Sequence, residues 1–268
     1  MINLDEFHDD ILARYKAGEG LTSIARSYSV YEQRIRNYVT KHTGSIPKKP
    51  YSGDPTYFET IDTHLKAYFL GFIAGDGCVT GARRTLTITL NVKDVCVLEK
   101  FCEEMGSERG PYDLGMKNQV RFTHTSKGMA DNLAKYGIEP RKSLTMEDFI
   151  SKIPEQFRNS TILGLFDADG SIVVRDVPYK TWSHRKQAVQ IRCTEPVALA
   201  IVRESGIDSY HLSKRDAIPN LAISSVSNVC KFYHFVYKDC PFYLERKHDK
   251  FLSTLDLAQT ISSPSVSS

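Results

Sequence analysis

Two stretches of this sequence share one pattern, and that repeat most constrains the fold. Residues 69–77 read FLGFIAGDG, and residues 162–170 read ILGLFDADG. Each is the apolar end of a predicted helix with small residues at positions i and i+4. These small residues are Gly71 and Gly75 in the first copy, and Gly164 and Ala168 in the second. Because glycine costs helix stability, matched small residues predict two helices whose backbones approach closely.

Each copy of the motif ends in Asp-Gly, and crossing the two helices would bring Asp76 and Asp169 side by side. Two neighbouring carboxylates repel each other unless a cation lies between them. The main-chain carbonyls of Gly75 and Ala168 add oxygen ligands, and oxygen ligands suit Mg²⁺. The sequence therefore predicts a divalent metal site made of these four residues. For either copy alone, a helix stop without chemistry remains an alternative.

From residue 61 onward the predicted elements occur in the same order twice: helix, two strands, helix, two strands, helix. In residues 85–90 apolar and polar residues alternate strictly, with Leu86, Ile88 and Leu90 on the inner face. Such alternation predicts half-buried strands. The fold class is therefore α+β, a pseudo-twofold αββαββα repeat, with a small all-α domain before it.

The outer face of each predicted sheet is polar and rich in basic residues, which suits strands that lie in a DNA groove. A merely solvated sheet face is the alternative. The candidate DNA contacts on the sheets are Arg83, Thr85, Thr87, Thr89, Gln119, Arg121, Thr123, Arg175, Lys186, Gln190 and Arg192.

Residues 5–42 read as three short helices and resemble a helix-turn-helix module. Ser29 to Glu32 form a predicted capping box that starts the third helix, whose buried side would be Ile35, Tyr38 and Val39. A plain three-helix bundle is the alternative. The side chains expected to face DNA are Gln33, Arg34, Arg36, Asn37 and Lys41.

The predicted boundaries follow from these patterns. Prolines, glycines and lysines between the helical module and the repeat predict a linker, in which Lys48 and Lys49 could contact phosphates or be solvated. The expected segments are 1–43 for the helix-turn-helix domain, 44–60 for the linker, 61–145 and 146–258 for the two halves, and 259–268 for a disordered tail.

Composition adds limits to these predictions. The chain has 268 residues, 41% of them hydrophobic, with a formal net charge of only +3, so any basic surface must be local. No run is long and apolar enough to span a bilayer, and no signal-peptide core is present. We expect a protein that is not secreted and that lies in the cytoplasm, an organellar matrix or a phage-infected cell.

The segments GFIAGDG (71–77) and GLFDADG (164–170) resemble the two motifs of a single-chain LAGLIDADG homing endonuclease. The resemblance covers about residues 57–256, and the first motif departs from it at Ala74, where the family often has an acidic residue. The resemblance implies a monomeric, site-specific endonuclease that binds double-stranded DNA and hydrolyses one phosphodiester in each strand, leaving short 3′ overhangs. It implies Mg²⁺ as cofactor, with Mn²⁺ or Ca²⁺ able to occupy the site, and an intron as the source of the gene.

The same resemblance implies four catalytic residues. Asp76 and Asp169 would bind metal, and a lysine after the last helix of each half, Lys142 and Lys247, would assist the reaction. Two other functions remain open. A DNA-binding transcription regulator on this fold would not cut DNA, and an intron maturase would bind RNA. Retention of both aspartates favours the nuclease.

Overall fold

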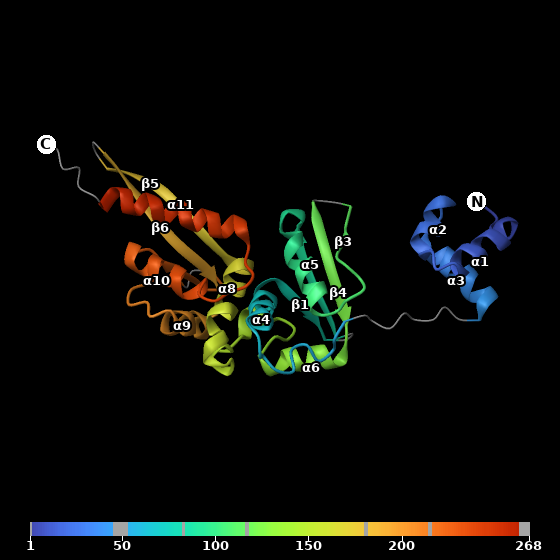
Figure 1. Ribbon diagram of the computed structural model, residues 1–268, viewed down its shortest axis with the longest axis horizontal. Helices are drawn as coiled ribbons and strands as arrows, with labels where there is room; N and C mark the ends of the chain where they lie inside the picture. Colours follow the sequence, from blue (N-terminus) through green and yellow to red (C-terminus); the bar gives the residue numbers. More distant parts are fainter. Residues whose placement is uncertain are drawn as a thin grey trace. The chain divides into compact units, whose positions relative to one another are not determined.

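The chain forms two compact units, Met1–Pro50 and Tyr51–Ser268, each with its own hydrophobic core. Figure 1 shows the computed structural model, which describes residues 2–44, 53–81, 84–115, 118–179, 182–213 and 216–262. Several predicted DNA contacts fall outside these residues, namely Lys48, Lys49 and Arg83. Within the described ranges, no helix is both long enough and apolar enough to cross a membrane.

The first unit is a cluster of short helices. They are η1 (Leu4–Phe7), α1 (His8–Lys16), α2 (Leu21–Ser27) and α3 (Glu32–Thr43). Ile35 and Val39 of α3 are fully buried, as predicted. The predicted capping box is wrong: the N-cap of α3 is Tyr31, without a side-chain cap. Ser29 instead has φ 52° and its N–H donates to Arg26 O, so it belongs to the turn that ends α2.

The second unit contains two halves with the same order of elements. The first half comprises α4 (His64–Asp76), β1 (Gly77–Thr80), β2 (Thr85–Asn91), η2 (Val92–Asp94), α5 (Val95–Glu104), β3 (Tyr112–Asp113), β4 (Gln119–Thr125), α6 (Lys127–Lys135) and α7 (Lys142–Thr145). The second comprises η3 (Ile150–Lys152), η4 (Glu155–Phe157), α8 (Arg158–Asp169), β5 (Gly170–Tyr179), β6 (Trp182–Arg192), α9 (Glu195–Glu204), β7 (His211–Ser213), β8 (Asn220–Ile223), α10 (Val226–Val236) and α11 (Glu245–Ser262).

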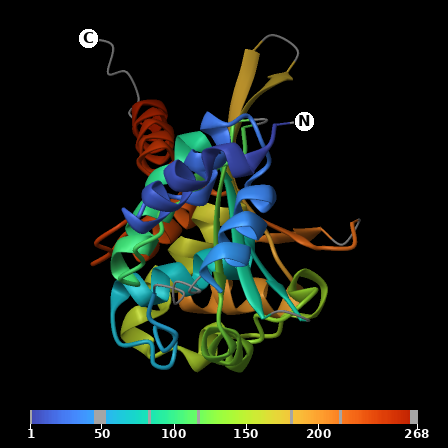
Figure 2. The same cartoon turned by 90° about the vertical axis from the view of Figure 1, so that its right-hand side faces the viewer.

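Each half contributes one antiparallel four-stranded sheet. The strand orders are β1-β2-β4-β3 and β5-β6-β8-β7, which are equivalent. Strands β5 and β6 form a long hairpin that extends beyond the rest of its sheet (Figures 1 and 2). The predicted α+β fold with an internal repeat is therefore confirmed.

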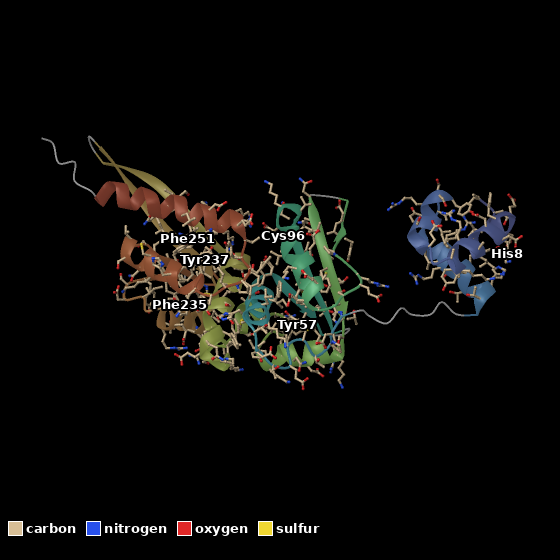
Figure 3. The ribbon with its side chains drawn as sticks, viewed as in Figure 1. His8, Tyr57, Cys96, Phe235, Tyr237 and Phe251 are labelled. Atoms are coloured by element: carbon tan, nitrogen blue, oxygen red, sulfur yellow. The ribbon has the colours of Figure 1, made fainter. Side chains whose placement is uncertain are left out.

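The inner faces of both sheets supply the core, as the alternation predicted. Leu86, Ile88 and Leu90 are buried in the first half, and Val189 and Ile191 in the second. Side chains of α11 and of the residues at the end of α10 extend this core, where the rings of Tyr237 and Phe251 lie 6.1 Å apart (Figure 3).

Two predicted boundaries need correction. The predicted linker 44–60 is too long, because Tyr57 and Phe58 are buried against Phe101. Helix α11 continues to Ser262, four residues past the predicted end of the second half at 258.

Helices α4 and α8 cross at the predicted small residues. A Cβ atom placed on Gly71 would lie 1.9 Å from Thr161 O, and one placed on Gly164 would lie 1.9 Å from Tyr68 O. Real atoms cannot approach so closely, so the contact requires glycine at both positions. The predicted close approach of the two backbones is confirmed.

We expect Gly71→Ala or Gly164→Ala to destabilise the second unit by at least about 1–3 kcal/mol, because overpacking costs this much and the neighbour here is backbone. Larger residues such as leucine would cost more. The measurement is the melting temperature of the second unit. Gly110→Ala is a matched control, since its new Cβ would meet nothing within 4 Å. Equal melting temperatures for all three variants would contradict the crossing.

Candidate functional site

Asp76 and Asp169 are the last residues of α4 and α8, and the helix crossing brings these two ends together. A Cβ on Gly75 would lie 2.4 Å from Ala168 Cβ and 3.1 Å from Asp169 Oδ2. The Asp169 carboxylate therefore lies beside the C-terminal end of α4. Both aspartates keep solvent exposure, so the pair faces outward at the helix ends.

Desolvation and repulsion act together on this pair. Partial burial, followed by the neighbouring Asp169 carboxylate, raises the pKa of Asp76 to about 6. Burial also raises the pKa of Asp169, while the charges of Lys142 and Lys247 oppose the rise. Two carboxylates that resist ionisation at one place need positive charge nearby.

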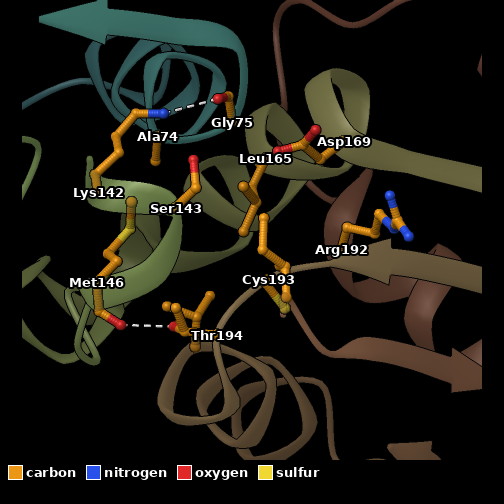
Figure 4. Close-up of a pocket in the computed structure, with 12 residues that line it drawn as sticks. Ala74, Gly75, Lys142, Ser143, Met146, Leu165, Asp169, Arg192, Cys193 and Thr194 are labelled. Carbon is orange, nitrogen blue, oxygen red and sulfur yellow. Dashed lines mark hydrogen bonds between the residues drawn. The ribbon is translucent and has the colours of Figure 1, made fainter. Parts of the chain in front are cut away.

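Lys142 supplies part of that charge to the first helix. Its side chain is only 5% exposed, and Nζ donates to Gly75 O at 2.8 Å (Figure 4). The last carbonyls of a helix lack partners within the helix, so the ammonium satisfies one of them at the end of α4. No second acceptor for this ammonium occurs among the described residues.

Lys247 holds the end of the second helix more completely. Its Nζ donates to Phe166 O, Asp167 O and Gly170 O, each at 2.7 Å. An ammonium has three N–H groups, so these bonds use all of them. Burial lowers the pKa of Lys247 to about 8 and also lowers that of Lys142. The structure thus places both predicted lysines at the ends of the two helices that carry Asp76 and Asp169.

A cavity of about 200 Å³ opens beside Lys142 and Asp169 (Figure 4). Met146 O accepts a hydrogen bond from Thr194 Oγ1 at 2.6 Å at one side of it. The sequence patterns gave no reason to expect Thr194 here. The lining residues are Ala74, Gly75, Lys142, Ser143, Met146, Leu165, Asp169, Arg192, Cys193, Thr194, Val197 and Ile218.

Asp167 is a further acidic residue near this site, and the sequence patterns gave it no predicted role. It is 2% exposed, and its Oδ2 accepts from the Tyr68 hydroxyl and from the Leu244 N–H, each at 2.9 Å. Burial raises its pKa to about 6. Its position in the motif, two residues before Asp169, is the one sequence feature that could have drawn attention to it. Nothing in the sequence indicates its partners.

The donor set at the helix ends suits a hard divalent cation. Asp76 and Asp169 are carboxylates that repel each other, and a cation between them would remove that repulsion. The predicted ligand Gly75 O already accepts from Lys142, so it could serve only if that ammonium moved. Among the described residues no group of three or more His, Cys, Asp or Glu could hold a metal. Any cation here would therefore rely on two carboxylates and main-chain oxygens.

The predicted DNA contacts of the first sheet lie together on its polar face. Thr87 pairs with Thr123, and Thr89 pairs with Arg121 across β2 and β4. Arg121 Nε donates to Thr89 Oγ1 at 3.0 Å, which holds the guanidinium against the sheet. Thr85 and Gln119 complete this face at opposite ends of the same strand pair.

In the second sheet, Gln190 and Arg192 lie on β6 with their side chains on the outer face. Arg192 Nη2 bonds Asp216 Oδ2 at 2.8 Å in an exposed ion pair. The side chains of Arg175 and Lys186 lie outside the described part of the structure.

In the first unit, Arg36, Asn37 and Lys41 are exposed on α3 as predicted. Arg34 differs, because it is half-buried and its Nη2 donates to Ile2 O. That guanidinium therefore ties α3 to the start of the chain. The Gln33 side chain lies outside the described part.

No known protein-family profile and no curated protein sequence matches the chain. Solved structures do. The I-LtrWI LAGLIDADG homing endonuclease bound to target DNA has a TM-score of 0.54 at 10% identity and covers 74% of this chain and 91% of its own. The chain has the LAGLIDADG homing endonuclease fold.

Two further structures share this LAGLIDADG fold. The LAGLIDADG meganuclease I-AabMI bound to uncleaved DNA has a TM-score of 0.52 at 16% identity, covering 72% of this chain and 91% of its own. I-SmaMI bound to an uncleaved DNA target in the presence of calcium ions has a TM-score of 0.52 at 11% identity, and the match covers 74% of this chain and 93% of the I-SmaMI chain.

We expect Asp76→Asn to raise the melting temperature at pH 7–8 without divalent cations. The folded-state pKa of Asp76, about 6, is above its ordinary value of 3.8, so the folded state binds this proton more tightly. Its ionised form therefore costs stability at neutral pH, and the cost fades as pH falls from about 6 towards 4. Thermal unfolding against pH checks this.

Asp208→Asn is the control with the opposite sign, because Lys231 lowers the pKa of Asp208. It should lower the melting temperature at pH 7. A lower melting temperature for Asp76→Asn at pH 7 would contradict the repulsive pair.

Proposed function

We propose that this chain is a divalent-metal-dependent homing endonuclease that hydrolyses one phosphodiester in each strand of a DNA duplex. The proposal rests on the arrangement of residues at the C-terminal ends of the crossed helices α4 and α8. There Asp76 and Asp169 lie at adjacent helix ends, and the buried ammonium groups of Lys142 and Lys247 act on both carboxylates. The likeness to DNA-bound LAGLIDADG structures supports the same reading.

The polar sheet faces supply the DNA-binding surface in this proposal. Their cross-strand rows of Thr, Gln and Arg can donate and accept hydrogen bonds at base edges and phosphates. Strand ladders fix the spacing of such rows, so they would position the duplex over the helix ends. Double-stranded DNA bound by a monomer is the complex we propose.

In the proposed hydrolysis, a divalent cation and the two lysines have different roles. A divalent cation such as Mg²⁺, held by Asp76 and Asp169, would supply an activated water and stabilise the leaving oxygen. Mn²⁺ or Ca²⁺ could occupy the same place. Lys142 has two N–H groups without an acceptor in the described structure, which could stabilise charge on the phosphate oxygens. Lys247 would hold the end of α8 and add its charge beside Asp76.

The first unit is proposed as a helix-turn-helix module that binds the flank of the target. Its exposed Arg36, Asn37 and Lys41 lie on one helix that can enter a major groove. We also propose that the gene is carried by an intron and that the protein lies in the cytoplasm, an organellar matrix or a phage-infected cell.

Replacing Asp76 or Asp169 by Asn should abolish cleavage while DNA binding persists, because Asn keeps the shape but loses the charge that holds the cation. The wild-type chain with Mg²⁺ would first select a substrate from a plasmid library of randomised duplexes. Cleavage is read on gels, and binding by mobility shift in Ca²⁺.

Asp131→Asn serves as the control, since Asp131 pairs with Arg84 away from the helix ends. Cleavage by either site variant at the wild-type rate would overturn the two-carboxylate site. Binding without cleavage by the wild-type chain would instead favour a transcription regulator.

A chain that begins at Gly53 should cut at the same positions but bind more weakly. Asp54 N donates to Met105 O, so Asp54 belongs with the second unit. The truncated chain must therefore begin before Asp54. Loss of a tethered module lowers avidity by roughly 10²–10⁴, and each lost phosphate contact reduces the salt slope by about 0.9. Footprinting should show one flank protected only by the full chain. Identical footprints and salt slopes would leave the first unit without a DNA-binding role.

A further inference from the structure

The first turn of α11 is attached to the opposite half of the second unit. Arg246 donates from Nε to Asp94 Oδ1 and from Nη2 to Asp94 Oδ2, each at 2.6 Å. Asp94 ends η2 in the first half, and its side chain is only 13% exposed. A two-bond Arg–carboxylate pair fixes orientation as well as distance. This pair therefore fixes where α11 begins relative to the first half.

A second carboxylate holds the residue just before the same helix. Asp167 Oδ2 accepts from Leu244 N, and the same oxygen accepts from Tyr68 Oη of α4. Tyr68 is fully buried, so this contact too joins the two halves inside the core. Leu244 and Arg246 are thus both anchored within one helical turn.

Lys247 is the next residue after Arg246, and its position depends on these anchors. Its ammonium reaches three carbonyls at the end of α8, and it is the lysine that acts most strongly on Asp76. The two carboxylate anchors and the three carbonyls together leave this lysine little freedom.

Among the residues that the structure describes, the first half shows no equivalent attachments. Ala74 occupies the place in the repeat that Asp167 occupies in the second half, so no carboxylate is available there. Arg141, the residue before Lys142, is exposed and has φ 69°. Lys142 itself reaches a single carbonyl among the described residues. The two halves of the pseudo-twofold repeat therefore differ in how firmly their lysines are held.

We propose that Asp94, Arg246 and Asp167 are positioning residues that hold Lys247 beside the paired carboxylates, and that they control cleavage of one DNA strand only. This inference rests on the proposed nuclease function. Lys142 is bonded at the end of α4 and Lys247 at the end of α8, so a defect confined to α11 should affect one scissile phosphate. Lys142, held from α7, should continue to act at the other.

The first experiment follows a supercoiled plasmid that carries a duplex selected by the wild-type chain, and it separates nicking from linearisation. Asp94→Ala and Arg246→Ala should each slow the second cut by roughly 10-fold or more, because a misplacement of about 1 Å can cost about 10²-fold. The first cut should keep its rate, so nicked circles accumulate. End-labelled strands should show that the same strand stays intact in both variants.

Two comparisons separate positioning from general destabilisation. The double variant Asp94→Ala/Arg246→Ala should be no slower than either single variant, because both act through one contact. Asp131→Ala removes an exposed Arg–carboxylate pair of 2.7 Å elsewhere and should leave the ratio of the two cuts unchanged. Equal slowing of both strands by Asp94→Ala would overturn the proposal, since a loss of folded protein affects the strands alike.

A second experiment needs no DNA. Lysine acetylation by an N-hydroxysuccinimide ester, followed by mass spectrometry of the full chain, should label Lys247 several-fold faster in Asp94→Ala than in wild type. Labelling of Lys142 should not change. Equal labelling of Lys247 in both proteins would overturn the anchoring. If the wild-type chain selected and cut no duplex, the nuclease function would fail, while the labelling result would still decide whether α11 holds Lys247.

Discussion

The contact between α4 and α8 is the interaction on which the second unit depends. The backbones meet at Gly71 and Gly164, where any side chain would overlap a carbonyl oxygen of the other helix. This contact joins two four-stranded sheets through one shared core. It also brings two helix ends together, with their aspartates and with carbonyls that have no partner within the helix. Stability and the candidate site therefore arise from the same crossing.

That arrangement concentrates like charges, and the structure offsets them with buried cations. Partial burial and mutual repulsion raise the pKa values of Asp76 and Asp169. Lys142 and Lys247 place ammonium groups on the carbonyls at the ends of the two helices. A carboxylate pair held in this way resists full ionisation, and a divalent cation between the two carboxylates would remove that cost. Local instability of this kind is typical of sites built for function.

The repeat is symmetric in its elements but not in its contacts. Strand order and helix order match between the halves. In the described part of the chain, Lys247 nevertheless has three acceptors where Lys142 has one. Asp94 and Asp167 hold the turn that carries Lys247. One of the differences between the two motifs, Ala74 against Asp167, accompanies this asymmetry. Two lysines at equivalent places in a repeat thus have different freedom to move.

The sequence by itself determined the fold class, the element order, the buried strand faces, the helix crossing and the two aspartates. These depend on local patterns: alternation in strands, glycine where backbones meet, and Asp-Gly at a helix end. It misplaced the cap at Ser29, and it extended the linker to residue 60 although Tyr57 already belongs to the core. Only the tertiary structure decided those points, and with them the partners of Asp167 and the unequal bonding of the lysines. The physical reason is that Asp94 meets Arg246 across 152 residues of chain, and no local pattern encodes such a contact.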